Sequence, residues 1–127
     1  MNGVLIIDKP QGFTSFDVVA VVRRIFHQKK VGHTGTLDPM ATGVLPILLG
    51  NATRAASLMD DSDKEYCASF QLGQATDTQD STGKVIAQSE KKVSAEELER
   101  ALFKFRGHIL QVPPMYSACL LYTSRCV

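Results

Sequence analysis

The stretch that most constrains this chain is Gly32–Pro46, which places a single carboxylate, Asp38, directly in front of a proline. Pro39 disfavours the helical region for the residue before it and pushes Asp38 towards an extended conformation. Three glycines permit tight turns, and of these Gly35 is a candidate for close approach to a substrate. The stretch therefore predicts a shaped loop that presents one acid. An Asp-Pro pair alone is more typical of an ordinary turn, so a functional interpretation depends on the whole string.

The length and composition predict one globular domain. With 127 residues, 44% of them hydrophobic and 21% charged, the chain is long enough to bury a core. The net charge is only +1, but it is uneven. Residues 1–59 hold six basic and three acidic side chains, and the remainder holds eight basic and ten acidic ones. We therefore expect a polyanion to meet the first half rather than the second.

Several classes of protein and site do not fit the sequence. The apolar run at the N-terminus, residues 4–7, is too short for a signal peptide, and no stretch approaches bilayer length. We expect a cytoplasmic protein without a membrane partner. The three cysteines lack paired or metal-like spacing. Residues 74–83 resemble part of a calcium loop, but the glycine and the closing glutamate are misplaced. We expect no disulfide, no metal and no cofactor.

Hydrophobic periodicity predicts a mixture of helices and strands without strict alternation. Strands are expected at 4–7, 44–49, 64–73, 84–88 and 109–112, and helices at 15–28, 51–59 and 94–107, with an exposed polar loop at 74–83. Thr14 or Ser15 is expected to cap the first helix, Asn51 the second, and the capping box from Ser94 to Glu97 the third. The predicted class is α+β with a largely antiparallel sheet.

A basic cluster lies at the expected end of the first helix, and it comprises Arg23, Arg24, His27, Lys29 and Lys30. One interpretation is a solvated face with cations placed favourably at a helix C-terminus. The other is a phosphate-contacting edge next to the acid loop. The sequence leaves both interpretations open.

Taken together, these residues resemble the N-terminal part of the TruB family, the tRNA pseudouridine-55 synthases related to the catalytic subunit of box H/ACA particles. The resemblance covers positions 2 to 118 in order. It is carried by NGV at 2–4, DKPQG at 8–12, the Gly32–Pro46 string, DKEY at 63–66, LG at 72–73, TDT at 76–78, FRG at 105–107 and PMYSA at 114–118.

The resemblance implies the N-terminal part of the pseudouridine synthase fold, a mixed and largely antiparallel sheet with flanking helices. It implies an isomerase that converts uridine to pseudouridine at position 55 in the T loop of tRNA, with the tRNA T-arm as partner and a monomeric full-length enzyme. Asp38 matches the catalytic aspartate, His33 and Tyr66 match positions that contact the flipped uridine, and Lys9 belongs to a motif beside the site. For His33 a loop-organising hydrogen bond is the alternative, and for Tyr66 core packing in its strand.

The implied reaction is redox-neutral and needs neither metal nor nucleotide cofactor. Asp38 either attacks the base or sugar as a nucleophile, or removes a sugar proton to give a glycal, and the sequence does not choose between these routes. The target base must leave its stack at a cost of a few kcal/mol. Tyr66 offers an aromatic face worth roughly 1–3 kcal/mol per stacked base.

The resemblance stops after Ala118, where Cys119–Val127 replaces the family's RNA-clasping continuation. These nine residues can be encoded by TGTCTCTTATACACATCTAGATGTGTA, which looks like a transposase mosaic end joined to its reverse complement. We therefore expect residues 1–118 to be a partial catalytic domain and 119–127 a non-native read-through tail. Because the family's partner arginine lies beyond this point, we expect the chain alone to have little or no activity. The alternative function is a non-catalytic RNA-binding or tRNA-folding module.

Overall fold

The computed structural model describes residues 1–59 and 63–110. The chain divides into two compact units, Met1–Tyr66 and Cys67–Val127. In the part of the chain that is described, no helix is long and apolar enough to cross a membrane.

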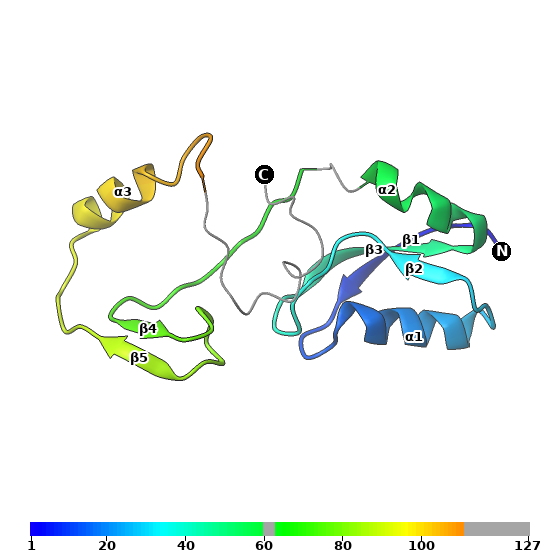
Figure 1. Cartoon of the computed structure of the whole chain (residues 1–127), viewed down its shortest axis with the longest axis horizontal. Helices are drawn as coiled ribbons and strands as arrows, with labels where there is room; N and C mark the ends of the chain where they lie inside the picture. The colour runs from blue at the N-terminus through cyan, green and yellow to red at the C-terminus, as the bar shows by residue number, and fades with distance from the viewer. Residues whose placement is uncertain (60–62, 111–127) are drawn as a thin grey trace. The chain divides into compact units, whose positions relative to one another are not determined.

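The first unit is built on a three-stranded antiparallel sheet in the order β1-β3-β2 (Figure 1). The strands are β1 (Gly3–Lys9), β2 (Val31–His33) and β3 (Gly43–Leu49). β1 pairs with β3 along its whole length, from Gly3 opposite Leu49 to Lys9 opposite Gly43. The strands expected at 4–7 and 44–49 are confirmed. β2 was not predicted, because a three-residue segment containing a glycine gives no readable alternation.

Helix α1 (Ser15–Ile25) follows β1 and covers one face of this sheet (Figure 1). Thr14 is the N-cap, and its side chain accepts from the backbone N–H of Asp17 while the Asp17 carboxylate accepts from Thr14. The helix ends before the expected residue 28 because His27 adopts a left-handed conformation with φ 47°. The N–H of Gln28 then donates to the carbonyl of Arg23 at 3.1 Å, which closes the helix as in a Schellman motif.

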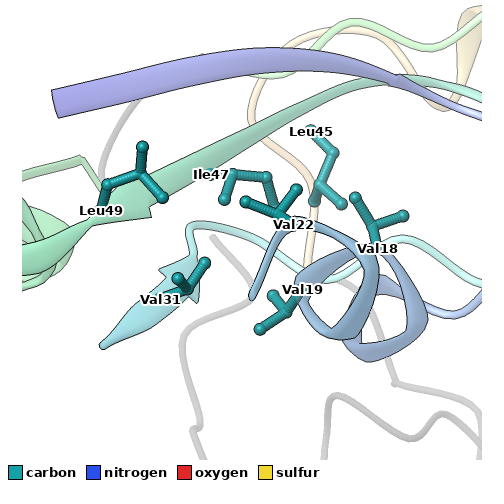
Figure 2. Packing of buried hydrophobic residues seen from close by; sticks show 7 residues of the cluster. All are labelled: Val18, Val19, Val22, Val31, Leu45, Ile47 and Leu49. Atoms are coloured by element: carbon teal, nitrogen blue, oxygen red, sulfur yellow. The ribbon is translucent and has the colours of Figure 1, made fainter. Parts of the chain in front are cut away.

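The hydrophobic core lies between α1 and the sheet. Valines of the helix pack against inward-facing residues of β2 and β3, and the cluster consists of Val18, Val19, Val22, Val31, Leu45, Ile47 and Leu49 (Figure 2). β-branched residues weaken a helix prediction, but here their spacing of three and four places one continuous stripe against the sheet. Burial of this stripe therefore outweighs the strand propensity of valine.

A 3₁₀ helix, η1 (Gly50–Ala55), and a short α2 (Ala56–Met59) stand where one helix was expected. Asn51 does not cap this segment, so that prediction is wrong. The N-cap position is Leu49, which makes no side-chain cap. The N–H of Asn51 instead donates to the Asn2 side chain at 2.7 Å, so a residue from the start of the chain satisfies this helix end.

The second unit contains a two-stranded antiparallel ribbon and one helix. β4 (Gln74–Thr76) pairs with β5 (Val85–Gln88), and α3 (Ala95–Phe103) follows. The strand expected at 84–88 is confirmed, as is the capping box between Ser94 and Glu97. The prediction of a polar loop over 74–83 is wrong at residues 74–76, because these residues form β4 and pair with β5. α3 ends four residues before Gly107.

The strand expected at 64–73 is wrong. Residues 63–73 form no strand, and Tyr66, Phe70 and Leu72 are exposed. Alternation indicates which face a strand would bury, but it supplies no pairing partner, and none of the described strands pairs with this segment. Of the strand expected at 109–112, residues 109 and 110 are irregular and the rest lie outside the described residues. So do the string at 114–118 and the tail 119–127. The α+β class with antiparallel sheets is confirmed.

Candidate functional site

The candidate site is the loop of residues 34–42 that joins β2 to β3. Its acid, Asp38, is exposed, as the sequence predicted for a presented carboxylate. The backbone turns sharply after it, since the N–H of Ala41 donates to the carbonyl of Asp38 at 3.0 Å. The loop therefore leaves β2, presents Asp38 at a turn and returns into β3.

Ser15, the first residue of α1, holds the loop immediately before the acid. The N–H of Leu37 donates to Ser15 Oγ at 3.0 Å, and the hydroxyl donates to the Leu37 carbonyl at 3.4 Å. Ser15 is only 2% exposed. Leu37 also packs against the core, so both its backbone and its side chain are anchored.

Lys9, the last residue of β1, holds the loop immediately after the acid. Its ammonium donates to the carbonyls of Phe13, Pro10 at 3.2 Å and Pro39 at 3.4 Å. Pro39 also accepts from the N–H of Gly12 at 2.7 Å. An ammonium has three protons to donate, so these three carbonyls use its whole capacity. Lys9 is completely buried, and the structure gives it a positioning role; contact between Lys9 and a substrate stays a prediction.

His33 lies at the end of β2, where the loop begins. Its Nδ1 is 2.8 Å from the carbonyl of Gly35. A carbonyl only accepts, so this geometry requires a proton on Nδ1 and leaves Nε2 as the acceptor of a neutral ring. The ring meets the exposed Phe16 edge to face, with centroids 5.3 Å apart and planes at 86°. The loop-organising hydrogen bond is therefore present, and contact with uridine remains a prediction.

Gly35 has a positive φ of 70°, in the region that favours glycine. A Cβ built at this position would meet no atom within 4 Å. The glycine is therefore explained by backbone conformation, and the open space beside it is compatible with the expected approach of a substrate.

Tyr66 is not brought to the loop by any described contact. Its side chain is 65% exposed in an irregular segment, and no hydrogen bond or ring contact joins it to Asp38 or His33 among residues 1–59 and 63–110. The alternative interpretation, core packing within a strand, is wrong because the strand is absent and the ring is exposed.

The basic cluster lies at the far end of α1 from the acid loop. Ser15 and Ile25, the ends of the helix, are separated by roughly 15 Å at 1.5 Å per residue. The prediction that the cluster lies next to the loop is therefore wrong. Arg23 donates to the carbonyl of Val31 at 3.1 Å and Lys30 to the side chain of Asn51 at 3.2 Å. A shallow depression is lined by Ala20, Arg23, Arg24, His27, Gln28 and Lys29.

Two residues that hold the site were missed from the sequence, Ser15 and Gly12. Ser15 was considered only as a possible helix cap. Once Thr14 takes that position, Ser15 is a hydroxyl on the buried side of a helix and needs another partner. The unpaired Ser15 hydroxyl could therefore have been inferred from the sequence, but the sequence does not show that its partner is Leu37. Among the described residues, no group of three or more His, Cys, Asp or Glu side chains could hold a metal ion.

Comparison with known proteins finds close relatives of the chain. The chain is 52% identical over 118 residues to tRNA pseudouridine synthase B of Fusobacterium nucleatum subsp. nucleatum, covering 93% of this chain and 41% of that protein. It is 56% identical over 119 residues to tRNA pseudouridine synthase B of Geotalea uraniireducens, covering 93% of this chain and 38% of that protein. The chain thus spans about two fifths of these relatives.

A solved structure supports the fold. A chain in the crystal structure of a Cbf5-Nop10-Gar1 complex matches with a TM-score of 0.62 and 31% identity, over 91% of this chain and 30% of that one. The sequence profile of the TruB family pseudouridylate synthases, N-terminal domain, matches residues 23–126. The chain belongs to the TruB family of pseudouridylate synthases and carries sequence of its N-terminal domain.

Proposed function

We propose that this chain is the N-terminal catalytic part of an isomerase that converts uridine to pseudouridine at position 55 of tRNA, with Asp38 as its catalytic carboxylate. The observation that carries the proposal is the anchored loop. It presents an exposed acid between two held neighbours, Leu37 and Pro39, in a chain of the TruB family. The relatives named above are tRNA pseudouridine synthases.

The proposed reaction requires one carboxylate that is held accurately against the uridine. The N1 glycosidic bond breaks, the uracil turns, and a bond forms from C5 to C1′. C5 then loses its proton and N1 takes one up, so the product is an isomer and no electrons are gained or lost. Asp38 acts either as the nucleophile or as the base that takes a sugar proton. In either route the carboxylate must meet its target atom at close to bonding geometry, because misplacement by about 1 Å can cost on the order of a hundredfold in rate.

We further propose that His33 and Tyr66 contact the flipped uridine and that the backbone at Gly35 lies against it. His33 already stands at the base of the loop, where the bond between its Nδ1 and the Gly35 carbonyl orients its ring. The exposed ring of Tyr66 has the surface that stacking on a base requires. Arg24 and Lys29, both exposed, are candidates for phosphate contacts at the other end of α1.

A chimeric enzyme tests the proposal. Residues 1–118 are joined to the C-terminal remainder of the Fusobacterium nucleatum relative, and the product is incubated with a tRNA T-arm stem-loop. We expect pseudouridine at position 55, and we expect Asp38→Asn to abolish it while RNA binding persists. Asp63→Asn serves as a matched control, because it removes an exposed carboxylate outside the loop. Equal product from the Asp38→Asn chimera would contradict the proposal.

The 127-residue chain alone is expected to form little or no pseudouridine under the same conditions. Formation at the rate of a full-length relative would refute this. RNA binding by the chain that is unaffected by Asp38→Asn, with no product from the chimera, would instead favour the non-catalytic RNA-binding module.

The remaining expectations concern the setting of the protein. We propose a cytoplasmic enzyme that is monomeric at full length, which light scattering of the chimera tests. We also propose that 119–127 is a read-through tail. Genomic codons for these residues that lack the inverted repeat would overturn that interpretation.

A further inference from the structure

We infer that Ser15 is a positioning residue for Asp38, and that its buried hydroxyl sets the direction in which the loop presents the carboxylate. The inference rests on the proposed function for the role of Asp38. It rests on the structure for the contact itself. Ser15 lies 22 positions from the residue it holds.

The hydroxyl engages both backbone polar groups of one residue. It accepts from the N–H of Leu37 at 3.0 Å and donates to the carbonyl of Leu37 at 3.4 Å. That carbonyl and the N–H of Asp38 belong to the same planar peptide unit. Fixing the carbonyl therefore fixes the plane from which the Asp38 side chain departs.

The backbone on the other side of the acid is fixed independently. The carbonyl of Asp38 accepts from Ala41, and the carbonyl of Pro39 accepts from Gly12. The proline ring also restricts its own φ. With both flanking peptides held, rotation of the Asp38 side chain is the main freedom left. Loss of the Ser15 bond would release the residue on one side only.

Helix capping does not account for the Ser15 hydroxyl. Thr14 already caps α1, through its side chain and the carboxylate of Asp17. The hydrogen bonds of Ser15 Oγ within the described residues go to Leu37 alone. The Thr14 hydroxyl thus caps the helix, whereas the Ser15 hydroxyl binds the loop. Alanine variants at these two adjacent positions therefore form a matched pair.

The test is amide hydrogen exchange by NMR on the 127-residue chain. In the unsubstituted chain we expect the Leu37 amide to exchange about tenfold more slowly than that of Thr36, whose N–H has no partner among the described residues. Ser15→Ala should accelerate Leu37 about tenfold and shift the Asp38 resonances, with the amide of Ile47 in β3 unchanged. Ser15→Thr, which keeps a hydroxyl, should restore both.

Thr14→Ala is the control, since it should accelerate the amides of α1 without moving Leu37 or Asp38. Unchanged Leu37 exchange in Ser15→Ala would overturn the inference, as would equal acceleration at Leu37 and Ile47, because Ser15 would then act on the whole core. If Ser15→Ala does not fold, equal exchange of Leu37 and Thr36 in the unsubstituted chain overturns it.

A kinetic measurement in the chimera separates positioning from simple stability. We expect Ser15→Ala to lower kcat at least tenfold with KM nearly unchanged, and Ser15→Thr to recover it. The exchange experiment uses neither RNA nor turnover. A chimera that forms no pseudouridine therefore counts against the proposed function, whereas unaltered loop exchange counts against Ser15.

Discussion

At the scale of single residues, the buried side chains of the candidate site, Lys9 and Ser15, hold the loop, whereas Asp38 is exposed. Lys9 is the clearest case, because a lysine is rarely fully buried. Its side chain is fully buried, and its ammonium joins the end of β1 to the carbonyl of Pro39, 30 positions away. Removing this side chain would leave the Phe13 carbonyl without a donor, and the Pro10 and Pro39 carbonyls would keep only the backbone N–H groups of Phe13 and Gly12.

We predict that Lys9→Met, which keeps the apolar stem, destabilises the first unit by on the order of 1–3 kcal/mol, because the Phe13 carbonyl loses its donor and the Pro10 and Pro39 carbonyls each lose one of two. Urea unfolding followed by far-ultraviolet circular dichroism measures the change. Lys29→Met is the matched control at an exposed lysine, where we expect a change within about 0.5 kcal/mol. Equal effects at the two positions would show that the burial of Lys9 carries no special weight.

At Gly50 the backbone conformation requires a glycine. Its φ is 58°, and a Cβ there would collide with the Met1 carbonyl and the Asn2 side chain. We predict that Gly50→Ala costs about 1–2 kcal/mol for the left-handed conformation and roughly 1–3 kcal/mol more for the collision. Gly3→Ala is the control, because a Cβ at Gly3 meets nothing within 4 Å. Thermal unfolding of both variants measures the difference.

At the scale of elements, the two longer helices begin in the same way. α1 and α3 each start with a capping box, formed by Thr14 with Asp17 and by Ser94 with Glu97. The bonds from Thr14 lower the pKa of Asp17 below its ordinary value of 3.8. The hydrogen bond from the Ser94 backbone N–H, and to a lesser degree the one from the Lys91 side chain, lowers the pKa of Glu97 below its ordinary value of 4.5.

A lowered folded-state pKa fixes the direction of the pH dependence. The unfolded chain takes up protons first, so the stabilisation from Asp17 is complete above its ordinary pKa and is lost as the pH falls through the lower folded-state pKa. We predict that the thermal midpoint of the first unit falls between pH 5 and pH 2 less steeply in Asp17→Asn than in the unsubstituted chain. Parallel acid profiles would contradict a role for the Asp17 carboxylate.

At the scale of the whole molecule, the two units differ in how much they bury. The first has a core of helix and sheet residues that are at most 5% exposed. In the second, no residue between 67 and 110 is buried. A segment with little buried apolar surface opens at a low free energy.

We therefore predict that the amide of Ala87 in β5 exchanges at least a hundredfold faster than that of Ile47 in β3. Both residues lie in antiparallel pairs, so the comparison holds the type of hydrogen bond constant and varies the burial. Amide exchange of the intact chain measures both in one sample. Comparable protection of the two amides would contradict the prediction.

Prediction from sequence succeeded where the signal was local. The capping box at Ser94, the apolar run of β3 and the exposure of Asp38 each follow from neighbouring residues. It failed at 64–73, where clear alternation met no partner strand, and at β2, where three residues gave no pattern. Sequence analysis also placed the basic cluster beside the acid loop. Closeness in sequence does not reveal that the cluster and the loop lie at opposite ends of α1.

The sequence by itself determined the string around Asp38, the starts of α1 and α3 and, through the strings shared with the TruB family, the membership of that family. Only the tertiary structure decided how the acid is held. Ser15 and Lys9 reach the residues on either side of Asp38 from 22 and 30 positions away. No periodicity or cap encodes such a pairing, because it depends on β1, β3 and α1 packing together and bringing a hydroxyl and an ammonium to the same loop.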